Sequence, residues 1–139
     1  MSIMQQADDL MSAATEAQAA TVPLVLMVSA TDCTYCAQLR VEVIEPTLLG
    51  QSERRTAVFR ELLVDVLDDI RDFDGNMTSA SEIAERYGAD LTPTLLFLAP
   101  NGAEAAARIV GISNIDFYAW YMDAQIEKAT ARLRGVPTG

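Results

Sequence analysis

The sequence predicts an α/β fold in which helices cover both faces of a mixed, four-stranded sheet. The first observation is the run VPLVLMVSA at 22–30, which lacks the polar alternation of a half-exposed strand. Such a run is typical of a central strand that is buried on both faces. The second is the order of segments, because apolar runs at 57–66 and 92–99 alternate with segments of helical period. A strand, a helix and a strand in succession imply parallel strands with a right-handed crossover.

The first half of the chain contains two expected helices. The first covers 3–20, and its apolar face is formed by Ile3, Ala7, Leu10, Met11 and Ala14. The second runs from about residue 33 to residue 49, after the first strand, and Gly50 is its expected stop. A side-chain oxygen of Thr31 or Asp32 is expected to cap its first turn.

The second half of the chain combines a short helix, a hairpin and a long helix. The polar stretch at 68–77 indicates a loop. Ser79 and Glu82 have the spacing of a capping box, which opens the short helix. The last apolar run is expected to pair as an antiparallel hairpin with a strand at 104–111. Asn114 then caps a helix whose apolar stripe consists of Ile115, Tyr118, Ala119, Met122, Ile126, Ala129 and Leu133.

Length and charge limit the organisation and the partners of the chain. Its 139 residues predict a single domain over 1–139 with a sizeable core, and the tail at 134–139 is expected to be frayed. The net charge of −10 argues against binding to nucleic acid or to anionic membranes, because both are negatively charged. No apolar segment reaches the roughly 18 residues that span a bilayer. We expect a monomer.

The start of the sequence bears on localisation. Residues 1–20 lack the basic start and the continuous apolar stretch of a signal peptide, and Asp8 and Asp9 lie in their middle. We expect a periplasmic protein whose signal peptide is not part of this sequence, with a cytoplasmic protein as the alternative. Two cysteines alone do not distinguish the two compartments.

The stretch TDCTYCAQLR at 31–40 contains the only two cysteines, Cys33 and Cys36, and the chain has no histidine. Zinc is disfavoured because structural zinc sites usually have four ligands, whereas two thiolates would suit Cu(I). A structural disulfide around two residues would restrict the unfolded chain only slightly. A redox pair is favoured, because the motif lies between a buried strand and a helix.

The two cysteines have different expected roles in such a pair. The amide dipoles at the start of a helix stabilise a negatively charged sulfur. Cys33 lies at the exposed end of the helix and is the expected nucleophile. Cys36 lies one turn inside and is expected to resolve the mixed disulfide.

Three separated stretches make the chain resemble the thioredoxin superfamily from the N-terminal helix to about Leu133. PLVLMVSATDCTYC runs from a strand into the redox helix, LTPTLLFLAPNG holds a Thr-Pro pair just before a strand, and ARIVGISNIDFYAW is similar to the family's last strand, glycine and C-terminal helix. The resemblance implies a thioredoxin-like fold that exchanges disulfides with protein thiols and with a redox partner. It implies no cofactor and no metal.

The resemblance also assigns expected roles near the cysteines. Pro93 matches the family's cis-proline beside the active disulfide, and the backbone of Thr92 is expected to pair with a substrate peptide. Gly111 matches a glycine on the wall of the substrate groove. Thr34 and Tyr35, between the cysteines, are expected to face solvent and to contact substrate.

Several positions depart from thioredoxins proper, which carry Gly-Pro between the cysteines where this chain has Thr-Tyr. Met27 stands where they have a buried acid, and Val41 where they have the proline that kinks the redox helix. Asp32 is expected to be a helix cap that also tunes the site, because a carboxylate beside Cys33 raises the pKa of that thiol and opposes the helix dipole. Arg40 is expected to be a surface charge.

These observations predict a thiol–disulfide oxidoreductase that works through Cys33 and Cys36, with the direction of electron flow left open. One alternative is a Cu(I) carrier that uses the same two sulfurs as ligands on a thioredoxin scaffold. The other is an interaction module that shares only the fold and in which the cysteines are inert.

Overall fold

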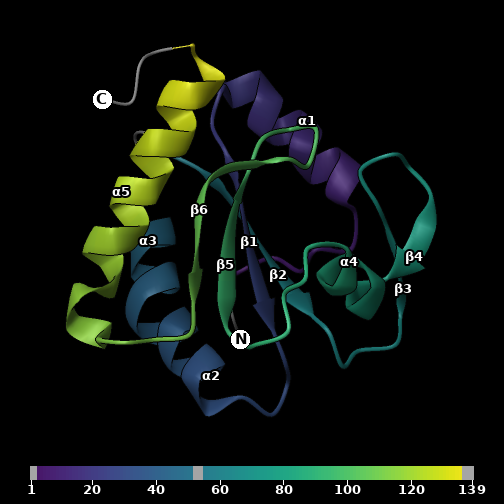
Figure 1. The fold of residues 1–139 in the computed structure, drawn as a ribbon, viewed down its shortest axis with the longest axis horizontal. Helices are drawn as coiled ribbons and strands as arrows, with labels where there is room; N and C mark the ends of the chain where they lie inside the picture. The colour runs from purple at the N-terminus through teal and green to yellow at the C-terminus, as the bar shows by residue number, and fades with distance from the viewer. Residues whose placement is uncertain (1–2, 52–54, 136–139) are drawn as a thin grey trace.

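The computed structural model describes residues 3–51 and 55–135 and contains a four-stranded mixed sheet (Figure 1). β1 pairs in parallel with β2 and antiparallel with β5, and β5 pairs antiparallel with β6. The predicted mixed sheet and its C-terminal hairpin are therefore confirmed. In the order β2-β1-β5-β6 across the sheet, the strands are Val58–Leu63, Leu24–Ser29, Thr94–Leu98 and Glu104–Val110.

Helices cover both faces of this sheet, as the sequence predicts. All six residues of β1 are buried, and successive side chains of a strand point to opposite faces. Leu24, Leu26 and Val28 pack on one face with α1 (Leu10–Ala20) and α4 (Ala80–Arg86). Val25 and Met27 pack on the other face with α2 (Thr34–Leu39) and α5 (Ile115–Leu133). The central strand thus separates two apolar clusters.

The prediction of a helix over 3–20 is wrong for its first turns, because α1 begins at Leu10. Residues 5–7 instead run beside β2, where the backbone of Glu61 bonds to Gln5 and Ala7 at 2.8 Å each, and the next residues pair with Arg71. Asp9 ends this extended segment, since its side chain accepts the backbone N–H of Ser12 at 2.9 Å as the helix cap.

The predicted helix at 33–49 is present but is interrupted by a π-helical turn. It consists of α2, the π-helix η1 (Arg40–Ile44) and α3 (Glu45–Gly50). The N–H of Glu45 bonds to the carbonyl of Arg40, five residues back. Pro46 follows at once and has no N–H to donate. The proline in the expected helix interior was the available signal for this irregularity.

The predicted loop at 68–77 contains a small second sheet. β3 (Asp69–Arg71) and β4 (Met77–Ser79) pair antiparallel. The turn between them is organised by Asp72, whose side chain accepts the N–H groups of Asp74 and Asn76 at 2.9 Å. The sequence did not predict this hairpin because its strands are polar. They are held by backbone pairing and lack the alternating apolar pattern that identifies a strand.

The helix caps predicted for the second half are confirmed. The hydroxyl of Ser79 accepts the N–H of Glu82 at 3.2 Å, and the side chain of Asn114 accepts the N–H of Asp116 at 3.0 Å. In the apolar stripe of α5, the residues from Tyr118 onward that reach the core are Tyr118, Met122, Ile126 and Ala129.

The expected fraying at 134–139 is wrong for its first two residues. The N–H groups of Arg134 and Gly135 bond to carbonyls of the last helical turn, and the Arg134 guanidinium donates to the carbonyl of Thr21 at 3.2 Å. Residues 136–139 lie outside the described part of the chain. Within that part, no helix combines the length and the apolar character needed to cross a membrane.

Candidate functional site

The sheet topology brings three predicted site segments to one end of the molecule, at the bottom of Figure 1. The chain leaves β1 toward Cys33 and enters β5 from Pro93, and these ends coincide because the two strands are antiparallel. The Thr92–Pro93 peptide bond is cis. Gly111 follows β6 and donates its N–H to the carbonyl of Pro93 at 2.8 Å.

Cys33 and Cys36 form a disulfide at the start of α2, with their Cα atoms 5.2 Å apart. Cys33 is half-buried, whereas Cys36 is fully buried beneath it. Cys33 itself is the N-cap residue, because its Sγ accepts the backbone N–H of Cys36 at 3.2 Å. The expectation that Thr31 or Asp32 caps this helix is therefore wrong.

A second donor reaches the same sulfur from the segment that precedes β5. The hydroxyl Oγ1 of Thr92 lies 3.5 Å from Sγ of Cys33 and donates to it. Donors directed at a sulfur favour its thiolate form once the disulfide is reduced. Cys33 is also the less buried of the two cysteines, so the arrangement suits nucleophilic exchange at Cys33 with Cys36 as the leaving or resolving sulfur.

The other predicted site residues lie around this pair. Thr34 is exposed, and Tyr35 exposes 63% of its surface. Asp32 is exposed next to Cys33. Gly111 has a φ of 67°, a conformation that side chains other than glycine rarely adopt. The backbone therefore requires glycine at this position, independently of any substrate.

A buried carboxylate beneath the redox helix was not predicted. Glu61 on β2 is opposite Met27 in the strand register and is only 2% exposed. Its carboxylate accepts the hydroxyl of Ser29 at 2.8 Å and the amide of Gln6 at 3.1 Å. It also forms an ion pair with Arg40 on η1. The signal was present, because Glu61 follows Arg60 within a strand whose other four residues are apolar.

Arg40 is consequently not the free surface charge that the sequence predicts. Its side chain exposes 20% of its surface, and its Nε lies 3.1 Å from Oε2 of Glu61. Because buried charges are seldom left without a partner, a glutamate in a buried strand predicts a positively charged side chain nearby. The sequence does not say which of the arginines supplies it.

Thr31 is bound in a different way from the predicted cap. Its N–H and its hydroxyl both donate to the carboxylate of Asp65, which follows β2. The hydroxyl of Thr31 is the main cause that holds the pKa of Asp65 below its usual value, and the N–H of Thr31 adds to it. This contact ties the loop before Cys33 to the end of β2.

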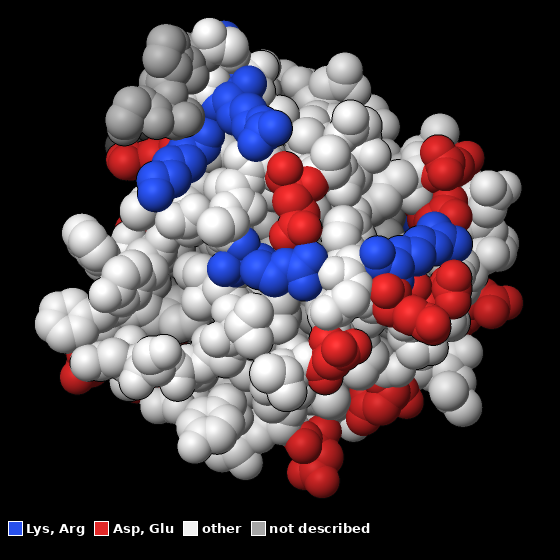
Figure 2. Space-filling view, viewed as in Figure 1, with Lys and Arg blue, Asp and Glu red and all other residues white. Residues whose placement is uncertain are grey.

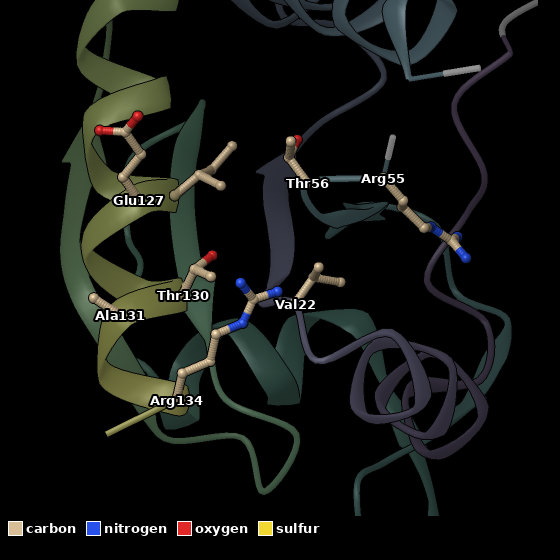
Figure 3. A pocket seen from close by; sticks show the side chains of 8 residues that line it. Val22, Arg55, Thr56, Glu127, Thr130, Ala131 and Arg134 are labelled. Carbon is tan, nitrogen blue, oxygen red and sulfur yellow. The ribbon is translucent and has the colours of Figure 1, made fainter. Parts of the chain in front are cut away.

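Several cavities in the described part of the chain lie outside the cysteine site, and two of them border α5. One of about 410 Å³ lies at the opposite end of the sheet, beside Val22 and α5 (Figure 3). Its Arg55 points away from α5 and pairs with Glu16 at 2.5 Å. The other, of about 350 Å³, lies between β6 and α5 and is lined by Tyr118 and Gln125. Neither cavity has a cysteine or a metal-ligand cluster among its lining residues.

The described residues also offer few ligands for a metal ion. Over residues 3–51 and 55–135, no group of three or more His, Cys, Asp or Glu side chains is placed to hold a metal ion. A copper site would therefore depend on the two sulfurs alone.

Comparisons with known proteins agree with the fold. A family model described as Thioredoxin-like domain matches residues 10–126. A comparison with curated proteins gives no match. A solved structure of a DsbH oxidoreductase is similar with a TM-score of 0.64 and 14% identity, over 91% of this chain and 87% of that one.

Two solved thioredoxins are also similar. Mitochondrial thioredoxin 3 from Saccharomyces cerevisiae, in its oxidised form, has a TM-score of 0.55 and 16% identity, over 89% of this chain and 93% of that one. A mutant thioredoxin from Halobacterium salinarum has a TM-score of 0.53 and 20% identity, over 88% of each chain. At these identities the structural likeness establishes the fold alone.

Proposed function

The chain belongs to the family of thioredoxin-like domains, and on that premise we propose that it is a thiol–disulfide oxidoreductase acting on protein substrates. The observation that carries the proposal is the asymmetry of the disulfide. Cys33 is only partly buried and its Sγ receives two hydrogen-bond donors, whereas Cys36 is fully buried. An inert structural disulfide requires neither feature.

The exchange proceeds in two steps and transfers two electrons. A substrate thiolate attacks Sγ of Cys33, the Cys33–Cys36 bond breaks, and Cys36 leaves as a thiolate that takes a proton from solvent. A second substrate thiolate then attacks the substrate sulfur of the mixed disulfide. This releases an oxidised substrate and leaves both cysteines reduced. The reverse sequence, starting from the Cys33 thiolate, reduces a substrate disulfide.

Thr92 offers a place for the substrate backbone. Within the described residues, its only hydrogen bond is the one from its hydroxyl to Cys33, so its own backbone N–H and C=O can pair with an extended peptide. Strand-like pairing of this kind positions a peptide through main-chain bonds that do not depend on its sequence. Tyr35 and Thr34 lie exposed beside the same sulfur and would contact the adjacent side chains.

The test is the reduction of insulin by dithiothreitol, followed by turbidity. The wild type should accelerate the reaction, and Cys33→Ser should abolish the acceleration. Cys36→Ser should trap a mixed disulfide through Cys33 that mass spectrometry detects. The double serine variant is the matched control, because the chain has no other cysteine.

Equal rates for the wild type and the double serine variant, with no trapped mixed disulfide, would refute the proposal. The copper-carrier alternative makes a different prediction for the same proteins. It requires stoichiometric Cu(I) binding that Cys33→Ser abolishes, together with no exchange activity.

The direction of electron flow depends on the relative stability of the dithiol and the disulfide. About 30 mV corresponds to about 1.4 kcal/mol for a two-electron couple. Contacts of a few side chains can change the relative free energy of the two forms by this amount. Asp32, Thr34 and Tyr35 are the residues we propose as tuning this balance. Equilibration with glutathione buffers measures the potential, and substitutions at these positions should shift it.

A further inference from the structure

The end of the molecule that holds the disulfide has a distinctive charge pattern. The parallel pairing of β1 with β2 and the antiparallel pairing of β5 place four connecting segments at this end. These segments cover 30–37, 64–68, 88–93 and 111–116. They contain neither lysine nor arginine, and their carboxylates, all exposed, are Asp32, Asp65, Asp68, Asp90 and Asp116.

Three of these carboxylates belong to residues that are close to Cys33 or Thr92 in the chain, or that bind the loop before Cys33. Asp65 binds the N–H of Thr31, two residues before Cys33. Asp32 is adjacent to Cys33 in the chain, and Asp90 lies two residues before Thr92. The basic residue on the helix itself, Arg40, is engaged by buried Glu61 and does not offset them.

The picture of the surface agrees with this pattern. In Figure 2 the lower part of the molecule, where the β1–α2 loop turns in Figure 1, shows Asp and Glu side chains and no Lys or Arg. The basic side chains of this view lie in its middle and upper parts.

Exposed apolar side chains accompany the carboxylates at this end. Leu67 is 92% exposed, Tyr35 and Leu91 are each 63% exposed, and Val110 is 49% exposed. Tyr35 lies between the cysteines, Leu91 precedes Thr92, and Val110 precedes Gly111. Exposed apolar side chains that surround a reactive group indicate a surface that contacts another molecule.

We propose that the substrate segment that exchanges with Cys33 is a basic polypeptide, in which Lys or Arg side chains flank the reacting cysteine. This inference rests on the proposed function and names its substrate class. Carboxylates around the sulfur attract a basic segment and repel an acidic one, which acts mainly on the encounter rate. A second copy of the chain is a poor occupant, because it brings the same carboxylates and a net charge of −10.

The experiment uses two synthetic pentapeptides, each with a central cysteine flanked by either two lysines or two glutamates. Each peptide thiol is mixed with the oxidised protein, and opening of the Cys33–Cys36 disulfide is followed by alkylation and mass spectrometry. Every rate is divided by the rate of the same peptide with hydroxyethyl disulfide, an uncharged small disulfide. This corrects for the effect of the flanking charges on the peptide's own thiol.

At low ionic strength the normalised rate of the lysine peptide should exceed that of the glutamate peptide by about tenfold. In about 0.5 M salt the ratio should fall to about twofold, because screening shortens the reach of exposed charges. Asp32→Asn/Asp90→Asn should lower the low-salt ratio by about threefold. Asp123→Asn/Glu127→Gln on α5 removes the same net charge elsewhere and should leave the ratio unchanged.

Equal normalised rates for the two peptides at low salt would overturn the basic-substrate inference while leaving disulfide exchange intact. A ratio that falls equally in both double variants would also overturn it, because net charge and not the placement of carboxylates would then be responsible. If neither peptide nor dithiothreitol opened the disulfide, the proposed function and this inference would both fail.

Discussion

The carboxylate of Glu61 and the guanidinium of Arg40 form an ion pair beneath the helix that carries the redox cysteines. Glu61 is contributed by β2, and Arg40 lies one turn after Cys36, at the start of η1. The same carboxylate binds Ser29 on β1 and Gln6 in the N-terminal segment. Four parts of the chain thus meet at one buried charge.

Breaking this pair should cost stability. Glu61→Gln leaves the largely buried Arg40 without its counter-charge, and we expect a loss of about 3 kcal/mol in the free energy of unfolding. Urea denaturation measures it. Arg40→Met combined with Glu61→Gln should be less destabilised than the sum of the single variants, because the two side chains interact. Glu85→Gln, an exposed glutamate, is the control and should change stability by less than about 0.5 kcal/mol. A loss that small for Glu61→Gln would contradict the role of the pair.

The hydroxyl of Thr92 should control the reactivity of Cys33. Thr92→Val keeps the shape of the side chain and removes the donor to Sγ. A hydrogen bond contributes about 0.5–1.5 kcal/mol, so alkylation of Cys33 by iodoacetamide at pH 7 should slow by about two- to tenfold. The measurement uses the Cys36→Ser background, in which only one thiol reacts. Thr92→Ser retains a hydroxyl and should react almost as fast as the parent. Identical rates for the valine and serine variants would show that the hydroxyl is not responsible.

Acid should destabilise the β3–β4 hairpin through Asp72. The N–H of Asn76, with help from Arg86 and the N–H of Asp74, holds the pKa of Asp72 below its usual value of 3.8, although burial acts in the opposite direction. A lowered folded pKa means that this stabilisation is complete above about pH 4. It is lost as the pH falls through the folded value, because the unfolded chain takes up the proton first.

The measurement is the urea midpoint of the wild type and of Asp72→Asn at pH 7 and at pH 3. The variant should be less stable at pH 7, and the difference should shrink at pH 3. Asp74→Asn, on the exposed side of the same turn, should follow the wild type at both values. A difference that is the same at both pH values would show that the charge of Asp72 is not involved.

Tyr118 should tolerate the loss of its hydroxyl. The side chain is buried, and its hydroxyl has no hydrogen-bond partner within the described residues. Burial raises the pKa of Tyr118, so the phenol stays protonated. Tyr118→Phe removes a buried polar group without creating a cavity. The free energy of unfolding of this variant should be between the wild-type value and about 1 kcal/mol above it. Tyr118→Ala should lose about 3 kcal/mol or more through the cavity that it creates. A phenylalanine variant that is less stable than the wild type would contradict the view that the hydroxyl is unpaired.

Much of the fold could be predicted from local pattern. The buried run of β1, the capping residues Ser79 and Asn114, and the final hairpin all depend on residues that are close in the chain. Their physical causes are periodicity, hydrogen bonding within a few residues and turn geometry. The prediction failed where a segment pairs with a strand that is distant in the chain. Residues 3–9, for example, have a helical pattern but are extended because of such pairing.

The sequence by itself determined that two cysteines flank the start of a helix and that a Thr-Pro pair precedes a later strand. Only the tertiary structure decided which groups act on Cys33, because Thr92 reaches its Sγ across 59 positions of the chain. The same holds for Arg40, whose partner lies 21 positions away on β2. A side chain's neighbours across a sheet follow from strand order and register. Those are properties of the folded chain, and no local spacing contains them.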